Sequence, residues 1–170
     1  MKHDRSHLVA EIPHLRRYAR ALTRNADWAD DLVQSCLEHA LRGFKSVRNG
    51  KRLRPWLFAI LHNLHVDMVR HQAKRGPTFP LEEDGQLQTK APGPDSRLDA
   101  RAVLDEIDRL PQEQRDAVIL IGVEELSYAE AAEVLAIPVG TLMSRLHRGR
   151  EKLRENLGKT RNEPVIRRVK

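Results

Sequence analysis

The side chains best suited to chemistry gather near the end of the sequence, on one face of an expected helix. They combine two hydroxyl groups with three cations: Thr141, Ser144, Arg145, Arg148 and Lys152. Hydroxyl and guanidinium groups donate hydrogen bonds to base edges, and cations farther along a helix pair with phosphates. The set is therefore typical of a helix that lies in the major groove of duplex DNA. A solvated surface helix can carry the same charges, so this face alone leaves both interpretations open.

Two short helices joined by a tight turn are expected to position this face. Ser127 and Glu130 have the spacing of a capping box, which marks the start of the first helix. Its apolar side is expected to comprise Ala129, Ala132, Val134 and Leu135. Ile137-Pro138 ends this helix, and the second begins near Val139. The inner stripe of the second helix has a period of 3.6 residues and comprises Val139, Leu142, Leu146 and Leu153. A helix-turn-helix of this form favours DNA binding over a solvated surface helix.

Composition also favours a polyanionic partner. The 170 residues include 30 Lys and Arg against 24 Asp and Glu, which gives a net charge of +6. A second basic patch lies between residues 45 and 75, where eight cations accompany one acid, Asp67. No run approaches the length of a membrane span, and the charged N-terminus does not resemble a signal peptide, so we expect a cytoplasmic protein. The single cysteine, Cys36, excludes an intrachain disulfide and is expected to be a small buried apolar residue.

The pattern along the chain predicts an all-α fold of two small helical lobes joined by a flexible linker. Residues 76–97 contain four Pro and three Gly with no helical period, so they are interpreted as the linker. The first lobe, residues 1–75, has three or four helices, which include Pro13–Arg24, a helix from about Asp27 to Phe44, and Pro55–Lys74. The second lobe, residues 98–158, has four, with one helix capped by Ser96 and another beginning at Pro111. A basic tail, residues 159–170, is expected to be disordered.

An enzyme or a metal site has little support. His62, His65 and His71 form the one histidine cluster, and no Cys or Glu is placed to complete a ligand set. Solvated or DNA-facing histidines explain the cluster better, and we expect no metal or cofactor. Phosphate loops, nucleophile elbows and paired catalytic carboxylates are missing from the sequence.

The order of a basic helical lobe, a linker and a helix-turn-helix lobe resembles the small sigma factors of bacterial RNA polymerase, the extracytoplasmic-function type. In the second lobe the resemblance rests on Leu110-Pro111, Arg115, Leu126-Ser127-Tyr128, Ile137-Pro138, Gly140-Thr141, Ser144-Arg145-Leu146 and Arg148. In the first lobe it rests on Asp30-Asp31-Leu32-Val33-Gln34, Trp56-Leu57, Ile60, Asn63, Asp67 and Arg70. Three positions depart from the family pattern: Ala136 and Glu125 stand where glycine is common, and Gly149 stands where alanine is common. Alanine in a left-handed turn, or glycine within a helix, would each cost about 1 kcal/mol unless close packing requires the glycine.

The resemblance implies core RNA polymerase and promoter DNA as partners, with an anti-sigma factor as a further one. Docking on polymerase would use Asp30, Asp31, Gln34 and Glu38. The downstream promoter element and its melted strand would contact Lys51, Arg52, Arg54, Trp56, Asn63, Arg70 and Lys74. The upstream element would contact Thr141, Ser144, Arg145, Arg148 and Lys152, while the linker acids Glu82, Glu83 and Asp84 would enter the RNA channel.

Simpler interpretations exist for some of these residues. Asp27 and Asp30 also stabilise a helix N-terminus without any partner, and Trp56 is equally well explained as a core residue. The alternative function is a stand-alone helix-turn-helix regulator. Such regulators normally dimerise, and no heptad or second apolar face supports a homo-oligomer here.

Overall fold

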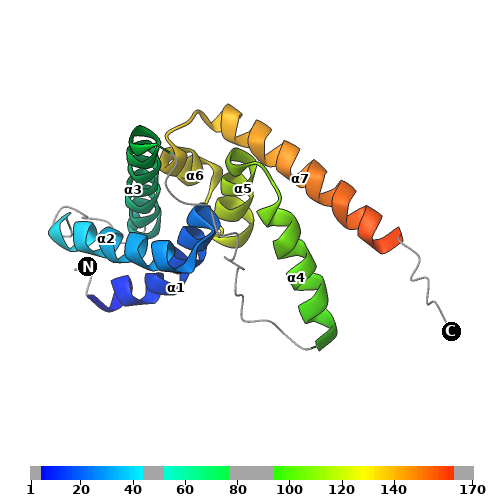
Figure 1. Ribbon diagram of the computed structural model, residues 1–170, viewed down its shortest axis with the longest axis horizontal. Helices are drawn as coiled ribbons and strands as arrows, with labels where there is room; N and C mark the ends of the chain where they lie inside the picture. Colours follow the sequence, from blue (N-terminus) through cyan, green and yellow to red (C-terminus); the bar gives the residue numbers. More distant parts are fainter. Residues whose placement is uncertain (1–4, 44–51, 77–93, 163–170) are drawn as a thin grey trace.

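The computed structural model describes residues 5–43, 52–76 and 94–162, and these residues are helical with short connections (Figure 1). The first lobe contains α1 (Arg5–Thr23), α2 (Ala26–Gly43) and α3 (Leu53–Arg75). The second contains α4 (Pro94–Asp108), α5 (Gln112–Val118), the π-helical turn η3 (Ile119–Val123), α6 (Tyr128–Leu135) and α7 (Val139–Asn162). The predicted all-α fold of two lobes is confirmed. None of the described helices is long and apolar enough to cross a bilayer.

The first helix begins earlier than predicted. Pro13 was expected in its first turn, but α1 starts at Arg5 and Pro13 lies inside it. The preceding turns are held in place because Leu8 is buried in the core and Glu11 pairs with Arg54 of α3. Pro13 and Val9 are exposed, so the carbonyl that proline leaves without a donor can be hydrated. The helix after the break agrees better with expectation, since the Asn25 side chain caps α2 by accepting from the Trp28 N–H at 3.0 Å.

The second lobe differs from the prediction at both ends. Helix α4 begins at Pro94, so its first turn falls in the segment interpreted as linker, and Ser96 is inside the helix and is not its cap. Helix α7 continues to Asn162, so residues 159–162 are helical and not part of a disordered tail. The linker acids Glu82, Glu83 and Asp84 lie outside the described residues.

The apolar faces of α6 and α7 agree with the prediction except at their first turns. Val134, Leu135, Leu142 and Leu146 are buried, whereas Val139 and Ala129 are exposed. Both exposed residues lie in the first turn of their helix, beyond the point at which the neighbouring helices cover it. Ala131, which was not among the predicted apolar residues, is also buried.

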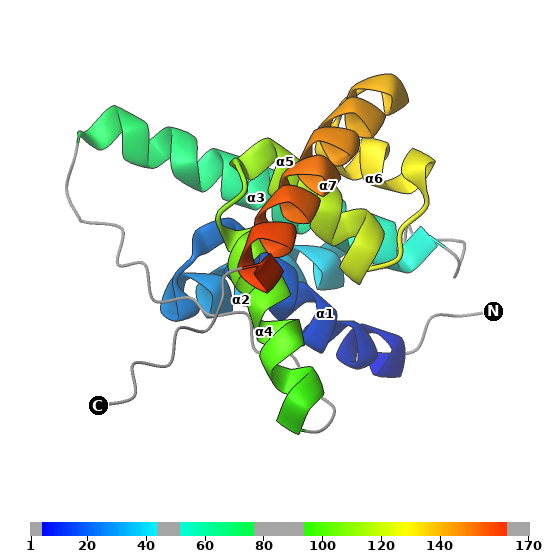
Figure 2. The same ribbon diagram turned by 90° about the vertical axis from the view of Figure 1, so that its right-hand side faces the viewer.

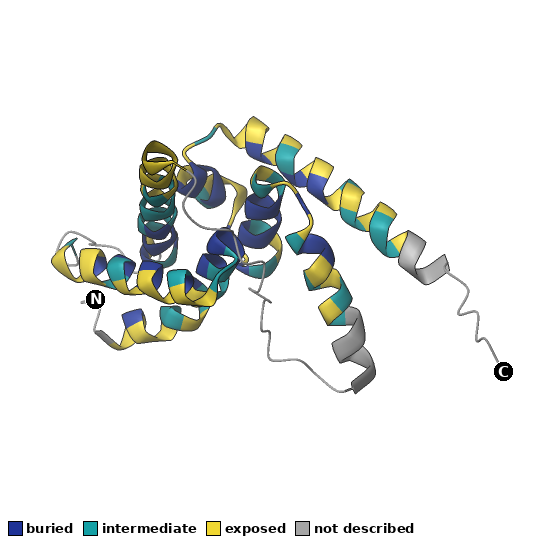
Figure 3. Cartoon of the chain, in the orientation of Figure 1, coloured by how far each residue is buried: buried dark blue, intermediate teal, exposed yellow. Residues whose placement is uncertain are grey.

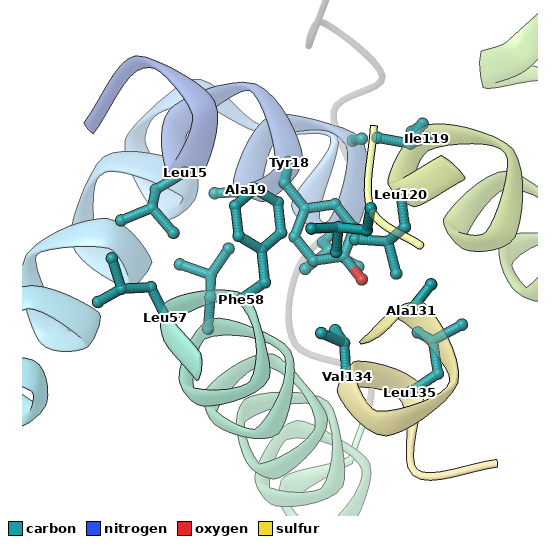
Figure 4. Packing of buried hydrophobic residues seen from close by; sticks show 14 of the residues in the cluster. Leu15, Tyr18, Ala19, Leu57, Phe58, Ile119, Leu120, Ala131, Val134 and Leu135 are labelled. Carbon is teal, nitrogen blue, oxygen red and sulfur yellow. The ribbon is translucent and has the colours of Figure 1, made fainter. Parts of the chain in front are cut away.

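The two lobes pack against each other and share a core (Figure 3). Helix α3 lies beside α6, and α1 lies beside α5. Figure 4 shows the contact, where Tyr18 of the first lobe lies between Phe58 of the same lobe and Leu120 of the second, with Val134 below it. The rings of Tyr18 and Phe58 stack with their centroids 5.2 Å apart. The sequence predicted the lobes but not this arrangement.

Cys36 is buried in the first lobe, as expected. Its thiol donates to the Leu57 carbonyl across 3.4 Å, and burial raises its pKa to about 12. A thiol in such surroundings is a packing residue and a poor nucleophile.

Candidate nucleic-acid interface

The first half of α7 presents the polar face that the sequence predicted. Leu142 and Leu146 are buried on its inner side, where α7 packs against α5 and α6. Four of the five predicted contact residues are exposed on the other side, namely Thr141, Ser144, Arg148 and Lys152. The Ser144 hydroxyl donates to the Gly140 carbonyl at 3.1 Å, but its lone pairs stay open to a donor from a base.

Two apolar side chains that sequence reasoning did not assign to this surface also lie on it. Val139 is 42% exposed and Met143 is 51% exposed, one helical turn apart. Apolar groups on a major-groove helix contact the methyl group of thymine. Their spacing of four residues could have shown that both lie on one face of the helix. Because Val139 was assigned to the buried stripe, the exposed pair was missed.

The helix-turn-helix has the local geometry that its residues predict. The Ser127 side chain accepts from the Glu130 N–H, and the Glu130 side chain accepts from the Ser127 N–H, which completes the capping box. Ala136 ends α6 in the left-handed conformation, with φ 51° and ψ 44°. Glu125 is left-handed as well, with φ 56°. Both positions of the second lobe at which the resemblance led us to expect glycine therefore have the positive φ that glycine adopts most easily.

Arg145 does not lie freely on this surface. Its side chain is 23% exposed, and its Nη2 donates to Glu113 Oε1 of α5 at 2.9 Å. Behind this pair Asp116 is buried, and its Oδ1 accepts from Gln112 Nε2 at 2.5 Å. Burial raises the pKa of the Asp116 carboxyl to about 7, although Gln112 and the nearby Arg115 and Arg145 act in the opposite direction. Arg145 therefore joins α7 to α5 as well as bordering the predicted DNA surface.

Gly149 lies where α7 packs closely against α5. A Cβ atom at this position would be 2.8 Å from Cγ2 of Val118 and 3.4 Å from Cβ of Gln114. Close packing therefore accounts for the glycine in the middle of the helix.

The second predicted DNA surface lies on α3, whose outer half projects from the body (Figure 2). Its exposed residues include Arg52, Asn63, Arg70 and Lys74, while Lys51 lies outside the described residues. Arg54 and Trp56 are placed differently. The Arg54 guanidinium donates to both Glu11 carboxylate oxygens, at 2.7 and 3.2 Å, and Trp56 is half-buried beside the core and Gly43.

The histidines of α3 serve the core more than the surface. His62 Nδ1 lies 3.1 Å from the Tyr18 hydroxyl, and burial lowers the His62 pKa. His65 is also partly buried, which lowers its pKa to about 4, while His71 is exposed. In the described part of the chain no group of three or more His, Cys, Asp or Glu side chains could hold a metal ion.

The predicted polymerase-docking residues share one exposed side of α2. They are Asp30, Asp31, Gln34 and Glu38. Gln34 donates to Glu38 at 3.3 Å, and Arg16 of α1 lies 3.4 Å from Asp30. These contacts are exposed and weak, so a partner can replace them at little cost.

A buried polar contact between the lobes was missed by sequence reasoning. The Glu124 side chain has 0% exposure and accepts from Arg17 Nε at 2.6 Å, with His14 Nδ1 at 2.8 Å. The residues lie 107 and 110 positions apart, so no local pattern could connect them. The available signal was a carboxylate at the end of the apolar run 117–123.

Comparison with known proteins identifies a known domain in each of the two lobes. Residues 8–62 match the family model described as the Sigma2 domain of PhyR, and residues 100–153 match the model described as Sigma-70, region 4. The ECF RNA polymerase sigma factor EcfG of Rhodopseudomonas palustris is 38% identical over 88% of this chain and 82% of its own length. The chain belongs to the extracytoplasmic-function sigma factors. As such, this sigma factor serves promoter-directed initiation of transcription.

Other relatives and a solved structure extend the match. SigE of Mycolicibacterium smegmatis, also an ECF RNA polymerase sigma factor, is 40% identical over 86% of this chain and 58% of its own. The sigma factor RpoE of Bartonella quintana, solved in complex with the anti-sigma factor NepR, is 32% identical, with a TM-score of 0.73. That similarity covers 91% of this sigma factor and 96% of the solved chain. The solved relative therefore shares the fold of both lobes.

Proposed function

We propose that this sigma factor contacts two promoter elements, the upstream one through α7 and the downstream one through α3, while α2 docks on core RNA polymerase. The observation that carries the proposal is the exposed polar face of α7 in a capped helix-turn-helix, opposite buried Leu142 and Leu146. A helix whose inner side is fixed in this way presents its outer side rigidly to a major groove.

In the upstream contact, residues near the start of α7 read bases and later ones hold the backbone. Thr141 and Ser144 offer hydroxyl groups, Met143 offers an apolar contact to thymine, and Arg148 and Lys152 neutralise phosphates. Arg145 acts partly as a positioning residue, because Glu113 restrains its guanidinium.

In the downstream contact, the exposed cations and amide of α3 face the DNA. Asn63 can bond a base edge, and Arg52, Arg70 and Lys74 can hold backbone phosphates of an opened strand. Lys51 is proposed to join them. Arg54 and Trp56 have structural roles, Arg54 in its bond to Glu11 and Trp56 beside the core, so we give them a smaller share of the contact than the sequence alone indicated.

The chain itself performs no covalent step in this proposal, and polymerase carries out synthesis. The exposed acidic side of α2, with Asp31 and Glu38, is proposed to bind polymerase. We also propose regulation by an anti-sigma factor in the cytoplasm, which the similarity to the RpoE and NepR complex supports. No cofactor is required.

Transcription in vitro with core polymerase tests the proposal. We expect initiation at defined start sites, and a loss of about tenfold or more for Arg148→Ala, which removes a charged contact to a phosphate. Arg150→Ala is the matched control, because residue 150 is exposed on the same helix but about 200° around it. Specific DNA binding with no specific transcript would favour the stand-alone regulator instead.

A separate binding measurement tests polymerase docking. Asp31→Lys should weaken binding to core polymerase without DNA, whereas Glu155→Lys, a charge reversal on the exposed end of α7, should leave it unchanged. Equal affinity of the two variants would remove α2 from the docking surface.

A further inference from the structure

The buried carboxylate of Glu124 joins the two lobes. It follows the π-helical turn of the second lobe, and its partners, Arg17 and His14, come from α1 of the first. With 0% exposure, this carboxylate depends on those partners to replace water. If the lobes separated, water would reach it and the partners would no longer be needed.

Further polar contacts from α1 and α3 hold His14 in place. Arg54 Nη2 lies 3.3 Å from His14 Nε2, and Glu11 holds the same guanidinium. Arg17 Nη2 also lies 2.9 Å from His14 Nδ1, so an arginine stands beside each ring nitrogen of His14. The contact is thus anchored on α1 and α3 at once, and it acts as one unit.

The closed arrangement separates the two surfaces proposed to bind DNA. In Figure 2 the outer half of α3 projects to the upper left and the first half of α7 to the upper right, so the two surfaces diverge from each other. Duplex DNA is stiff over roughly 150 base pairs, so a promoter that followed both diverging helices would have to bend between them. Movement of the lobes relative to each other would place both surfaces along one promoter without that bend.

We propose that Glu124, Arg17 and His14 form a latch that holds the free protein closed, and that its release precedes recognition of the two promoter elements. The second part rests on the proposed function, whereas the first concerns the protein alone. The α2 surface stays exposed in the closed form, so docking on polymerase does not require release.

Small-angle scattering of the free full-length chain tests the latch without polymerase or DNA. Arg17→Gln leaves the buried carboxylate without its cation, and Glu124→Gln removes the carboxylate from the other side. We expect either change to shift the equilibrium between closed and open forms by about 100-fold, seen as a larger radius of gyration at unchanged helical circular dichroism. Glu125→Gln is the control, because it removes an exposed carboxylate from the adjacent position.

The outcomes separate clearly. A radius of gyration that stays at the wild-type value in both folded variants would overturn the latch. If Glu124→Gln does not fold, Arg17→Gln tests the same contact from the other lobe. The double variant adds a further check, since changes that simply sum would mean the two residues do not act together.

Promoter binding by polymerase tests the second part. With limiting sigma factor, Glu124→Gln should form promoter complexes about tenfold faster than wild type if the closed form predominates. Equal or slower formation would overturn the proposed order of events. Neither result depends on which side chains read the bases, so failure of the latch and failure of the proposed DNA contacts remain distinguishable.

Discussion

The substitution Gly149→Ala tests how closely α7 packs on α5. The added Cβ would lie 2.8 Å from Cγ2 of Val118, whereas two carbon atoms pack favourably at about 3.5–4.0 Å. Val118 is buried and β-branched, so it cannot rotate away easily. Overpacking of this kind costs about 1–3 kcal/mol, and the better helix propensity of alanine returns about 1 kcal/mol. We therefore expect a net loss of about 1 kcal/mol in the free energy of unfolding.

The same helix supplies a control of opposite sign. Gly158 is exposed and has no atom within 4 Å of an added Cβ, so Gly158→Ala should gain up to about 1 kcal/mol. Urea unfolding monitored by circular dichroism measures both, provided that the slope with denaturant stays unchanged. Val118→Ala should relieve the clash, so Gly149→Ala ought to be less harmful in that background. A gain for Gly149→Ala similar to that of Gly158→Ala would refute the close packing.

Three further predictions follow from local geometry and burial. Ala136→Gly and Glu125→Gly should each raise the free energy of unfolding by several tenths to about 1 kcal/mol, because both residues have a positive φ. The melting temperature should rise accordingly, and a lower melting temperature would contradict backbone strain at these positions. Burial raises the Asp116 pKa, so between about pH 4 and pH 7 the folded protein retains a proton that the unfolded chain loses. Wild-type stability relative to Asp116→Asn should therefore fall as pH rises through this range, by on the order of 1 kcal/mol per pH unit, and parallel pH profiles would contradict the shift. Cys36, with a pKa raised to about 12, should react with a thiol reagent at pH 8 only as the protein unfolds, so rapid labelling of native protein would argue against its burial.

Features set by neighbouring residues could be predicted from the sequence. The capping box needs Ser127 and Glu130 three positions apart, and the left-handed turn at Ala136 follows from the short connection to the next helix. The inner stripe of α7 follows the helical period at Leu142 and Leu146. Each depends on contacts within one or two turns, which the order of residues specifies directly.

Features set by distant residues could not be predicted in this way. Val139 obeys the same period as Leu142 but is exposed, because none of the described helices covers the start of α7. Arg54 looks like a DNA-binding cation until α1 places Glu11 beside it, 43 positions away. Likewise, Gly149 has a reason only when Val118 is seen across the helix crossing. Periodicity tells which side of a helix is apolar, but not which partner covers it.

The number of residues in the π-helical turn η3 determines whether Glu124 points at the other lobe. The Glu124 N–H bonds the Ile119 carbonyl at 2.9 Å, one residue farther back than in an α-helix. Deletion of one residue between positions 119 and 123 would restore α-helical spacing and rotate the following residue by about 100°. The Glu124 side chain would then point away from α1. Deletion of one residue in η3 is thus expected to abolish the contact even though the chain would still contain Glu124.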